Sequence, residues 1–271
     1  MKECKLATGE PKLVVESRGV VIGGGKPVVI AGPCSVEDPE MIRRIASFLA
    51  EEIRDELGIR NLILRGGAWK PRTHPYSFQG HGLKALEWLK QAGEEAGIPV
   101  ATEVMDPRDV EQATLLADFL WVGARNMQNT PLLRELGRSG KPVLLKRHFG
   151  AKIGEWICAA EYILAEGNER VALIERGTRG LNEYARFSLD LTVVPVVKRV
   201  SRLPLIVDVS HPAGERSLVP PLAYGSLAAG ADGIMIEIHP DPDKALSDAK
   251  QQLPLEDFKV LASGLKEAGL L

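Results

Sequence analysis

The sequence lacks any uninterrupted apolar run of about 18 residues, the length that a membrane-spanning helix needs. Its first residues are polar and lack the apolar stretch of a secretory signal. Neither sign of charge dominates, because 34 Lys and Arg stand against 36 Asp and Glu. This balance gives no electrostatic reason to expect a nucleic acid or an anionic membrane as partner. We therefore expect a cytoplasmic protein whose anion-binding sites are local.

Cysteine is also scarce, with only Cys4, Cys34 and Cys158. The three form no zinc-ribbon spacing, and an odd count fits a reducing compartment better than a disulfide framework. Cys158 falls on the apolar face of an expected helix, where we predict that it belongs to the core. We expect at most one of the three to carry chemistry.

What the chain does have is a regular alternation. Short apolar runs rich in β-branched residues alternate with stretches of helical period. The expected strands are 27–32, 61–66, 99–104, 118–124, 142–147, 171–176, 204–210 and 232–240. The expected helices are 39–57, 82–96, 108–116, one after Thr130, 153–166, 185–200, 219–229 and 255–268.

Strands buried on both faces read as continuous apolar runs, and helical crossovers make neighbouring strands parallel. Eight such units in about 250 residues predict an α/β fold, a closed (β/α)8 TIM barrel. A doubly wound open sheet is the alternative. Residues 13–15 and 20–22 predict a small hairpin, so we divide the chain into an N-terminal extension, 1–26, and a catalytic barrel, 27–271.

In barrels of this class the active site lies at the C-terminal ends of the strands. Each expected strand ends at or near an ionisable or thiol group. In strand order these are Cys34; Arg65 with Lys70 and Arg72; Glu103; Arg125; Lys146 with Arg147; Glu175 with Arg176; Asp208 with His211; and Glu237 with His239. Arginine matches phosphate and carboxylate oxygens bidentately, and lysine adds a mobile charge. The cluster predicts substrates with several negative charges, although a salt bridge to a neighbouring acid is the alternative for any one of these cations.

The residues at these strand ends also predict a metal site. Cys34, His211 and Glu237 follow the first, seventh and eighth strands, and closing a barrel makes the first and eighth strands neighbours. Thiolate, imidazole and carboxylate ligands suit Zn²⁺, Fe²⁺, Mn²⁺ or Co²⁺, and Asp248 offers a further carboxylate. The alternative is structural, with Cys34 as a small buried apolar residue and His211 as a hydrogen-bonded one.

Seven segments together resemble one enzyme family. They are AGPCSVED, LRGGAWKPRTHPYSFQGHG, VGARNMQN, PVLLKR, IERGTRG, DVSHPAGER and IEIHPDPDKALSDAKQQL, in this order from residue 31 to 253. They are similar to the 3-deoxy-D-arabino-heptulosonate 7-phosphate (DAHP) synthases of the type I beta subfamily. The sister family of 3-deoxy-D-manno-octulosonate 8-phosphate synthases typically carries KANRSS where this chain has KPRT at 70–73. The departure favours the heptulosonate family.

The resemblance implies condensation of phosphoenolpyruvate with erythrose 4-phosphate and release of phosphate, the first step of the shikimate pathway to aromatic compounds. It implies one divalent metal ion (Mn²⁺, Co²⁺, Zn²⁺ or Fe²⁺), a homotetramer, and catalytic roles for Lys70, Glu103 and His211. It further implies a phosphoenolpyruvate site of Arg65, Lys70, Arg125, Lys146 and Arg176, an erythrose 4-phosphate site of Arg72 and Thr73, and the metal ligands Cys34, His211, Glu237 and Asp248.

Three other functions stay open at this point. The acceptor can be arabinose 5-phosphate, as in the octulosonate family. Lys146 at a strand end can form an imine, as in Schiff-base barrel aldolases. The barrel can also bind sugar phosphates without catalysis, since a fold alone never proves chemistry. About 26 residues precede the first barrel strand, so we expect a bare catalytic core that Phe, Tyr and Trp do not inhibit.

Overall fold

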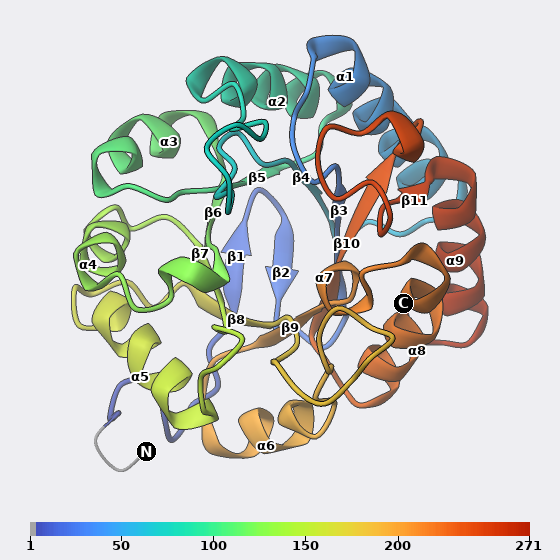
Figure 1. Ribbon diagram of the computed structural model, residues 1–271. Coiled ribbons are helices and arrows are strands. Elements are labelled where there is room, and N and C mark those ends of the chain that lie inside the picture. The colour runs from blue at the N-terminus through green and yellow to red at the C-terminus, as the bar shows by residue number, and fades with distance from the viewer. Residues whose placement is uncertain (1–3) are drawn as a thin grey trace.

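The structure is a computed structural model that describes residues 4–271. Eight parallel strands form the barrel in Figure 1. They are β3 (Val28–Gly32), β4 (Leu62–Arg65), β5 (Val100–Glu103), β6 (Phe119–Val122), β7 (Val143–Lys146), β8 (Val171–Glu175), β9 (Leu205–Asp208) and β10 (Gly233–His239). Because β10 pairs with both β3 and β9, the sheet closes on itself. The closed barrel is confirmed, and the open sheet is excluded.

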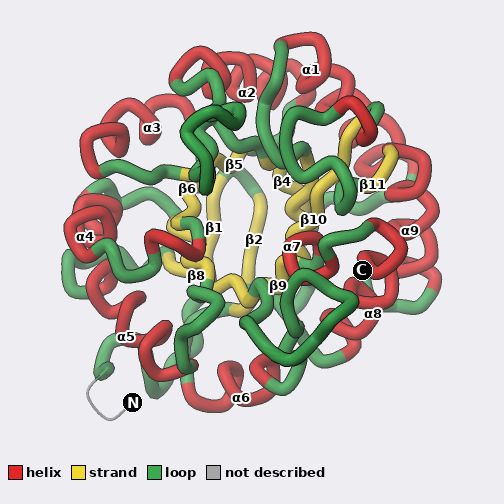
Figure 2. Tube along the Cα trace, in the orientation of Figure 1, coloured by secondary structure: helices red, strands yellow, loops and turns green. Residues whose placement is uncertain are grey.

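Helices form the outer ring, seen in red in Figure 2. They are α1 (Pro39–Phe48), α2 (Leu83–Ala96), α3 (Val110–Leu116), α4 (Thr130–Arg138), α5 (Ile153–Leu164), α6 (Val193–Val200), α8 (Val219–Ala228) and α9 (Leu255–Glu267). A π-helical segment, Leu49–Glu56, continues α1. The short helix α7 (Ser210–Ala213) and the strand β11 (Leu253–Pro254) were not expected from the sequence. Among the described residues, no helix meets the length and apolarity needed to cross a membrane.

Helix α6 begins at Val193, later than the 185 that the pattern predicted. Residues before it form a loop in which Ser188 pairs with Thr178 in an isolated antiparallel bridge. Asp190 then starts the helical turn, since its side chain accepts the backbone N–H of Thr192 at 3.1 Å. The apolar residues of 185–192 therefore belong to a loop over the barrel mouth.

The N-terminal hairpin lies across the end of the barrel where the strands begin. Strands β1 (Val15–Ser17) and β2 (Val20–Ile22) are antiparallel, and Figure 1 shows both through the centre of the barrel. Val15, Val20 and Ile22 are buried in one apolar cluster with interior barrel residues such as Phe119 and Trp121. The hairpin exists as predicted, but its first strand begins at Val15 instead of residue 13.

Cys4 and Cys158 form a disulfide, so the interpretation of the odd cysteine count as evidence against disulfides is wrong. Cys158 is only partly buried, which also corrects its assignment to the core. The cause is the path of the N-terminal segment along α5, where the Glu161 carboxylate accepts the backbone N–H groups of Leu6 at 2.7 Å and Ala7 at 2.9 Å. This contact brings together two cysteines that are 154 residues apart, a separation over which the sequence offers no signal.

Candidate active site

A cavity of about 350 Å³ opens at the C-terminal ends of the barrel strands. Nine of the residues predicted for the site line it: Lys70, Arg72, Thr73, Glu103, Arg125, Lys146, Arg176, His211 and Asp248. Arg186, Phe149 and Phe187 also line it and were not predicted. The cavity is thus strongly cationic, although the net charge of the chain is −2.

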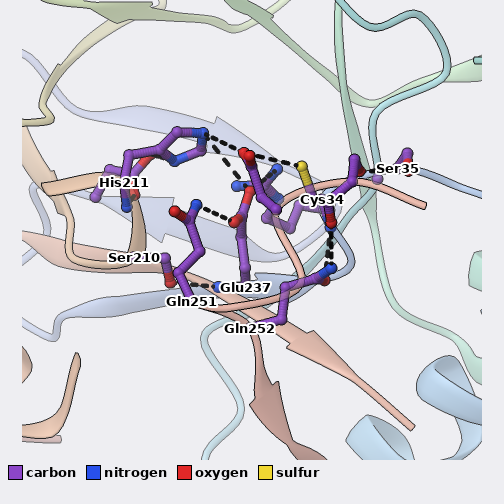
Figure 3. Close-up of polar contacts among 12 residues, drawn as sticks. Cys34, Ser35, Ser210, His211, Glu237, Gln251 and Gln252 are labelled. Atoms are coloured by element: carbon purple, nitrogen blue, oxygen red, sulfur yellow. Dashed lines mark hydrogen bonds and ion pairs between the residues drawn. The ribbon is translucent and has the colours of Figure 1, made fainter. Parts of the chain in front are cut away.

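Four polar side chains meet at one side of this cavity (Figure 3). Ligand atoms of Cys34, Glu237 and Asp248 all lie within 4.8 Å of one another. The Nε2 atom of His211 lies 3.7 Å from Glu237 Oε1 and 3.9 Å from Asp248 Oδ2. The closure of β10 onto β3 brings Glu237 to the loop that carries Cys34. The structure therefore brings together all four residues that the sequence analysis proposed as metal ligands.

The chemistry of this group suits a divalent cation. Glu237 is fully buried, and its Oε1 accepts no hydrogen bond from the described part of the chain. A buried carboxylate oxygen without a donor is costly unless a positive charge compensates it. Arg65 provides part of that charge, at 3.2 Å from the same oxygen. A mixed thiolate, imidazole and carboxylate set fits a transition metal or zinc.

Three side chains that the sequence analysis did not select hold the ligands in place. Gln251 donates from Nε2 to Glu237 Oε2 at 2.6 Å, and Ser210 Oγ accepts the Glu237 backbone N–H at 2.8 Å. Gln252 Oε1 accepts the Cys34 backbone N–H at 3.0 Å. Figure 3 shows these contacts around the cluster. Uncharged amides and hydroxyls carry no distinctive sequence pattern, so only the structure reveals them.

Lys70 joins the KPRT segment to this cluster. Its Nζ donates to Cys34 Sγ at 2.9 Å and to the Cys34 carbonyl oxygen at 3.0 Å. Burial disfavours the ammonium, but the acidic groups of Cys34, Glu237 and Glu103 outweigh it and raise the pKa of Lys70. Burial, reinforced by Glu237, raises the pKa of the Cys34 thiol to about 12. The structure therefore sets a lysine donor directly beside the thiol that the sequence analysis proposed as a metal ligand.

Asp208, at the end of β9, contacts the other side of the site. Its Oδ2 lies 2.6 Å from Lys146 Nζ and 2.8 Å from His211 Nδ1. Burial opposes ionisation of Asp208, but His211 and Lys146 prevail and hold its pKa well below the usual value. Burial lowers the pKa of His211 and of Lys146 despite their acidic neighbours. A neutral imidazole is the form that binds a metal.

The remaining predicted cations of the cavity wall leave donors for anions. Arg176 is buried, its Nη1 has no hydrogen-bond partner among the described residues, and its guanidinium lies 4.2 Å from the Phe187 ring centroid. Burial lowers the pKa of Arg176. Arg125 donates to the Pro71 carbonyl at 3.2 Å. Arg72 is half-buried, whereas Thr73 and Arg125 are exposed, so the wall carries cations both deep in the cavity and at its mouth.

Arg65 occupies a different place from the other predicted cations. Its side chain is 1% exposed, and its guanidinium lies 4.9 Å from the Trp121 ring centroid inside the barrel. It is absent from the cavity wall. Its ion pair with Glu237 places it directly beneath the four-residue cluster.

Glu103 lines the cavity, and its carboxylate packs directly against Gly123. A Cβ atom at Gly123 would lie 2.0 Å from Glu103 Oε1, so only glycine leaves room for this carboxylate.

Three other residues at strand ends make contacts outside the cavity wall. Arg147 and Glu175 form a buried ion pair at 2.9 Å, and His239 lies 3.8 Å from the Glu37 carboxylate.

The chain is similar to known proteins over nearly its whole length. The model of the DAHP synthetase I family matches residues 10–270. A Thermotoga maritima protein named phospho-2-dehydro-3-deoxyheptonate aldolase is 47% identical, over 94% of this chain and 73% of its own. A 2-dehydro-3-deoxyphosphooctonate aldolase of Desulfosudis oleivorans is 31% identical, over 91% of this chain and 92% of its own.

Two solved structures share the fold. The crystal structure of the Thermotoga maritima DAHP synthase has a TM-score of 0.89 and 46% identity, and the match covers 95% of this chain and 74% of that one. A truncated form of the Thermotoga maritima enzyme has a TM-score of 0.88 and 42% identity, and it covers 98% of this chain and 96% of its own.

Proposed function

The chain belongs to the DAHP synthetase I family, and from this premise we propose that it condenses phosphoenolpyruvate with erythrose 4-phosphate and water. The products are 3-deoxy-D-arabino-heptulosonate 7-phosphate and inorganic phosphate, and the reaction is the first step of the shikimate pathway. The enzyme is a transferase of aldol type.

One observation carries the proposal: a single cavity combines the four-residue cluster with a wall of cations. Two phosphates and one carboxylate must be bound, and Lys70, Arg125, Lys146 and Arg176 all offer their charges to the cavity. Arginine forks and lysine charges are the groups that recognise such anions. We assign these four to phosphoenolpyruvate, with Arg65 beneath them, and Arg72 with Thr73 to the phosphate of erythrose 4-phosphate.

Cys34, His211, Glu237 and Asp248 would hold one divalent metal ion. The unsatisfied Glu237 oxygen and the distances within the cluster support this part of the proposal. The ligand set suits Mn²⁺, Co²⁺, Zn²⁺ and Fe²⁺. Geometry and metal availability decide which of these ions binds. Such an ion supplies Lewis-acid polarisation of the aldehyde.

We assign the proton transfers to residues of this chain. C3 of phosphoenolpyruvate forms a bond to the aldehyde carbon, and Lys70 donates a proton to the aldehyde oxygen that becomes a hydroxyl. Its raised pKa keeps Lys70 protonated and ready for this step. Glu103 orients the water that adds at C2 and accepts its proton. The new C2 hydroxyl then loses its proton and becomes the carbonyl as the bond between C2 and the phosphate oxygen breaks, and the released phosphate takes up the proton.

The cytoplasmic location stays a prediction from the sequence, and the homotetramer rests on the family resemblance. Light scattering coupled to size-exclusion chromatography tests the second, because a tetramer has four times the 29.5 kDa of the chain.

The decisive experiment measures phosphate release from phosphoenolpyruvate with each of two acceptors. Erythrose 4-phosphate is expected to give the higher kcat/KM. Arabinose 5-phosphate is the acceptor of the alternative octulosonate reaction, and an equal or higher kcat/KM with it would reject the proposal. A barrel that only binds sugar phosphates would release no phosphate with either acceptor.

A further inference from the structure

Asp208 contacts both halves of the site through one oxygen atom. Its side chain is fully buried, and its Oδ2 lies 2.6 Å from Lys146 Nζ and 2.8 Å from His211 Nδ1. Its other oxygen, Oδ1, accepts the backbone N–H of His211 at 3.2 Å. One carboxylate therefore touches a residue assigned to phosphoenolpyruvate and a residue assigned to the metal.

On the histidine side, Asp208 selects the tautomer. A neutral imidazole carries one proton, and a carboxylate beside Nδ1 holds that proton on Nδ1. The lone pair is then on Nε2, the atom that faces Glu237 Oε1 and Asp248 Oδ2. Asp208 thus favours the tautomer in which His211 can ligate a metal through Nε2.

On the lysine side, Asp208 restrains the ammonium. Lys146 is 4% exposed at the end of β7, and the described salt bridges give it no other acidic partner. The Lys146 ammonium has three N–H donors. Its pair with Asp208 and its contact with a substrate anion both use these donors. A weaker pair with Asp208 leaves Lys146 freer to bind the substrate.

We propose that Asp208 is a positioning residue that couples metal binding to phosphoenolpyruvate binding. This inference rests on the proposed function. His211 Nδ1 and Lys146 Nζ both approach the same oxygen, Oδ2, so a metal held at Nε2 would draw this carboxylate toward the imidazole. The same oxygen then holds the Lys146 ammonium less tightly, and the ammonium turns to the phosphoenolpyruvate anion. By linkage, phosphoenolpyruvate strengthens metal binding by the same factor.

The test is a binding measurement. The dissociation constant of phosphoenolpyruvate is measured by calorimetry with and without Mn²⁺, in the wild-type protein and in Asp208→Asn. We expect Mn²⁺ to tighten phosphoenolpyruvate binding about 10-fold in the wild type and less than about 2-fold in the variant. Asp208→Asn is also expected to weaken Mn²⁺ itself by about 10- to 100-fold in competition with a chromophoric chelator.

The matched control is Asp232→Asn, which neutralises a largely buried carboxylate outside the cavity. Asp232 pairs with Lys198 at 2.8 Å, so this variant should keep the full coupling. If Asp208→Asn also keeps it, direct attraction between metal and substrate accounts for the coupling and the inference is wrong. A wild-type protein that binds neither Mn²⁺ nor phosphoenolpyruvate would instead reject the proposed function.

A folding defect is detected by circular dichroism before binding is measured. If Asp208→Asn does not fold, Asp208→Glu replaces it, because this variant keeps the charge but displaces both oxygens from His211 and Lys146. Loss of coupling in Asp208→Glu supports the inference, and full coupling overturns it.

Discussion

The Lys70 ammonium lies 2.9 Å from the Cys34 thiol and 3.0 Å from the Cys34 carbonyl oxygen. This contact places the first residue of the KPRT segment against a candidate metal ligand on the neighbouring strand's loop. The proposed proton donor and the proposed metal would therefore both act on the same substrate atom, the aldehyde oxygen.

Lys70→Met should lower kcat by about 10²- to 10⁴-fold, the usual contribution of a general acid. Metal affinity should change much less, because the four ligands remain. Steady-state kinetics with a metal titration separates the two effects. A variant whose kcat recovers at high metal concentration would place Lys70 in metal binding alone.

Metal affinity should rise with pH. Burial raises the pKa of the Cys34 thiol to about 12, and a metal needs the thiolate. Binding below this pKa must release one proton, so the affinity should increase about tenfold per pH unit between pH 7 and 9. His211 adds little in this range, because burial lowers its pKa.

Chelator competition at several pH values checks this slope. Cys34→Ala, which has no thiol to deprotonate, should bind the metal weakly and with little pH dependence. An unchanged affinity in Cys34→Ala would remove this residue from the ligand set.

Gly123→Ala should lower kcat by displacing Glu103. The new Cβ would lie 2.0 Å from Glu103 Oε1, a distance that forces the carboxylate to move. We expect a loss of about 10-fold or more in kcat, within the range of general-base effects. Gly150→Ala is the control, because its nearest contact would be an ordinary 3.5 Å from His148 Nδ1. Equal kcat values in the two variants would mean that the position of Glu103 does not matter.

The barrel could be predicted because its strands are buried on both faces. Residues 143–146 and 205–208, for example, are buried throughout, and such runs are visible without any tertiary information. Knowing the barrel also locates the site at the strand ends. The sequence could not show that Arg147 turns to Glu175 while Lys146, one position earlier, faces the cavity. Tertiary contacts decide such choices, as they do for Gln251 and the Cys4–Cys158 disulfide.

Cys158→Ser should lower the free energy of unfolding under oxidising conditions by about 2–4 kcal/mol, because the disulfide closes a long loop. The bond joins residues 154 apart and fastens the N-terminal segment to α5. Thermal unfolding of wild type and variant, each with and without dithiothreitol, provides the measurement. Reductant should lower the wild-type midpoint to that of the variant and leave the variant unchanged. Equal midpoints without reductant would show that the disulfide contributes nothing.

Lys146→Met should mainly weaken phosphoenolpyruvate binding, raising KM by about 30- to 150-fold for the loss of a charged hydrogen bond worth about 2–3 kcal/mol. The rival mechanism makes Lys146 an imine-forming nucleophile. Burial lowers the pKa of Lys146, which is also what such a nucleophile needs, so the contacts must decide. Its Nζ lies 2.6 Å from Asp208 Oδ2, and an ion pair at this distance favours the ammonium over the free amine.

Borohydride separates these mechanisms directly, because it reduces an imine to a stable amine but leaves an ammonium untouched. Treatment in the presence of either substrate should cause no inactivation and leave no label on Lys146 or Lys70. Label recovered on either lysine would establish the Schiff-base aldolase. In that case Lys146→Met would abolish turnover instead of raising KM, so the kinetic and chemical results must agree.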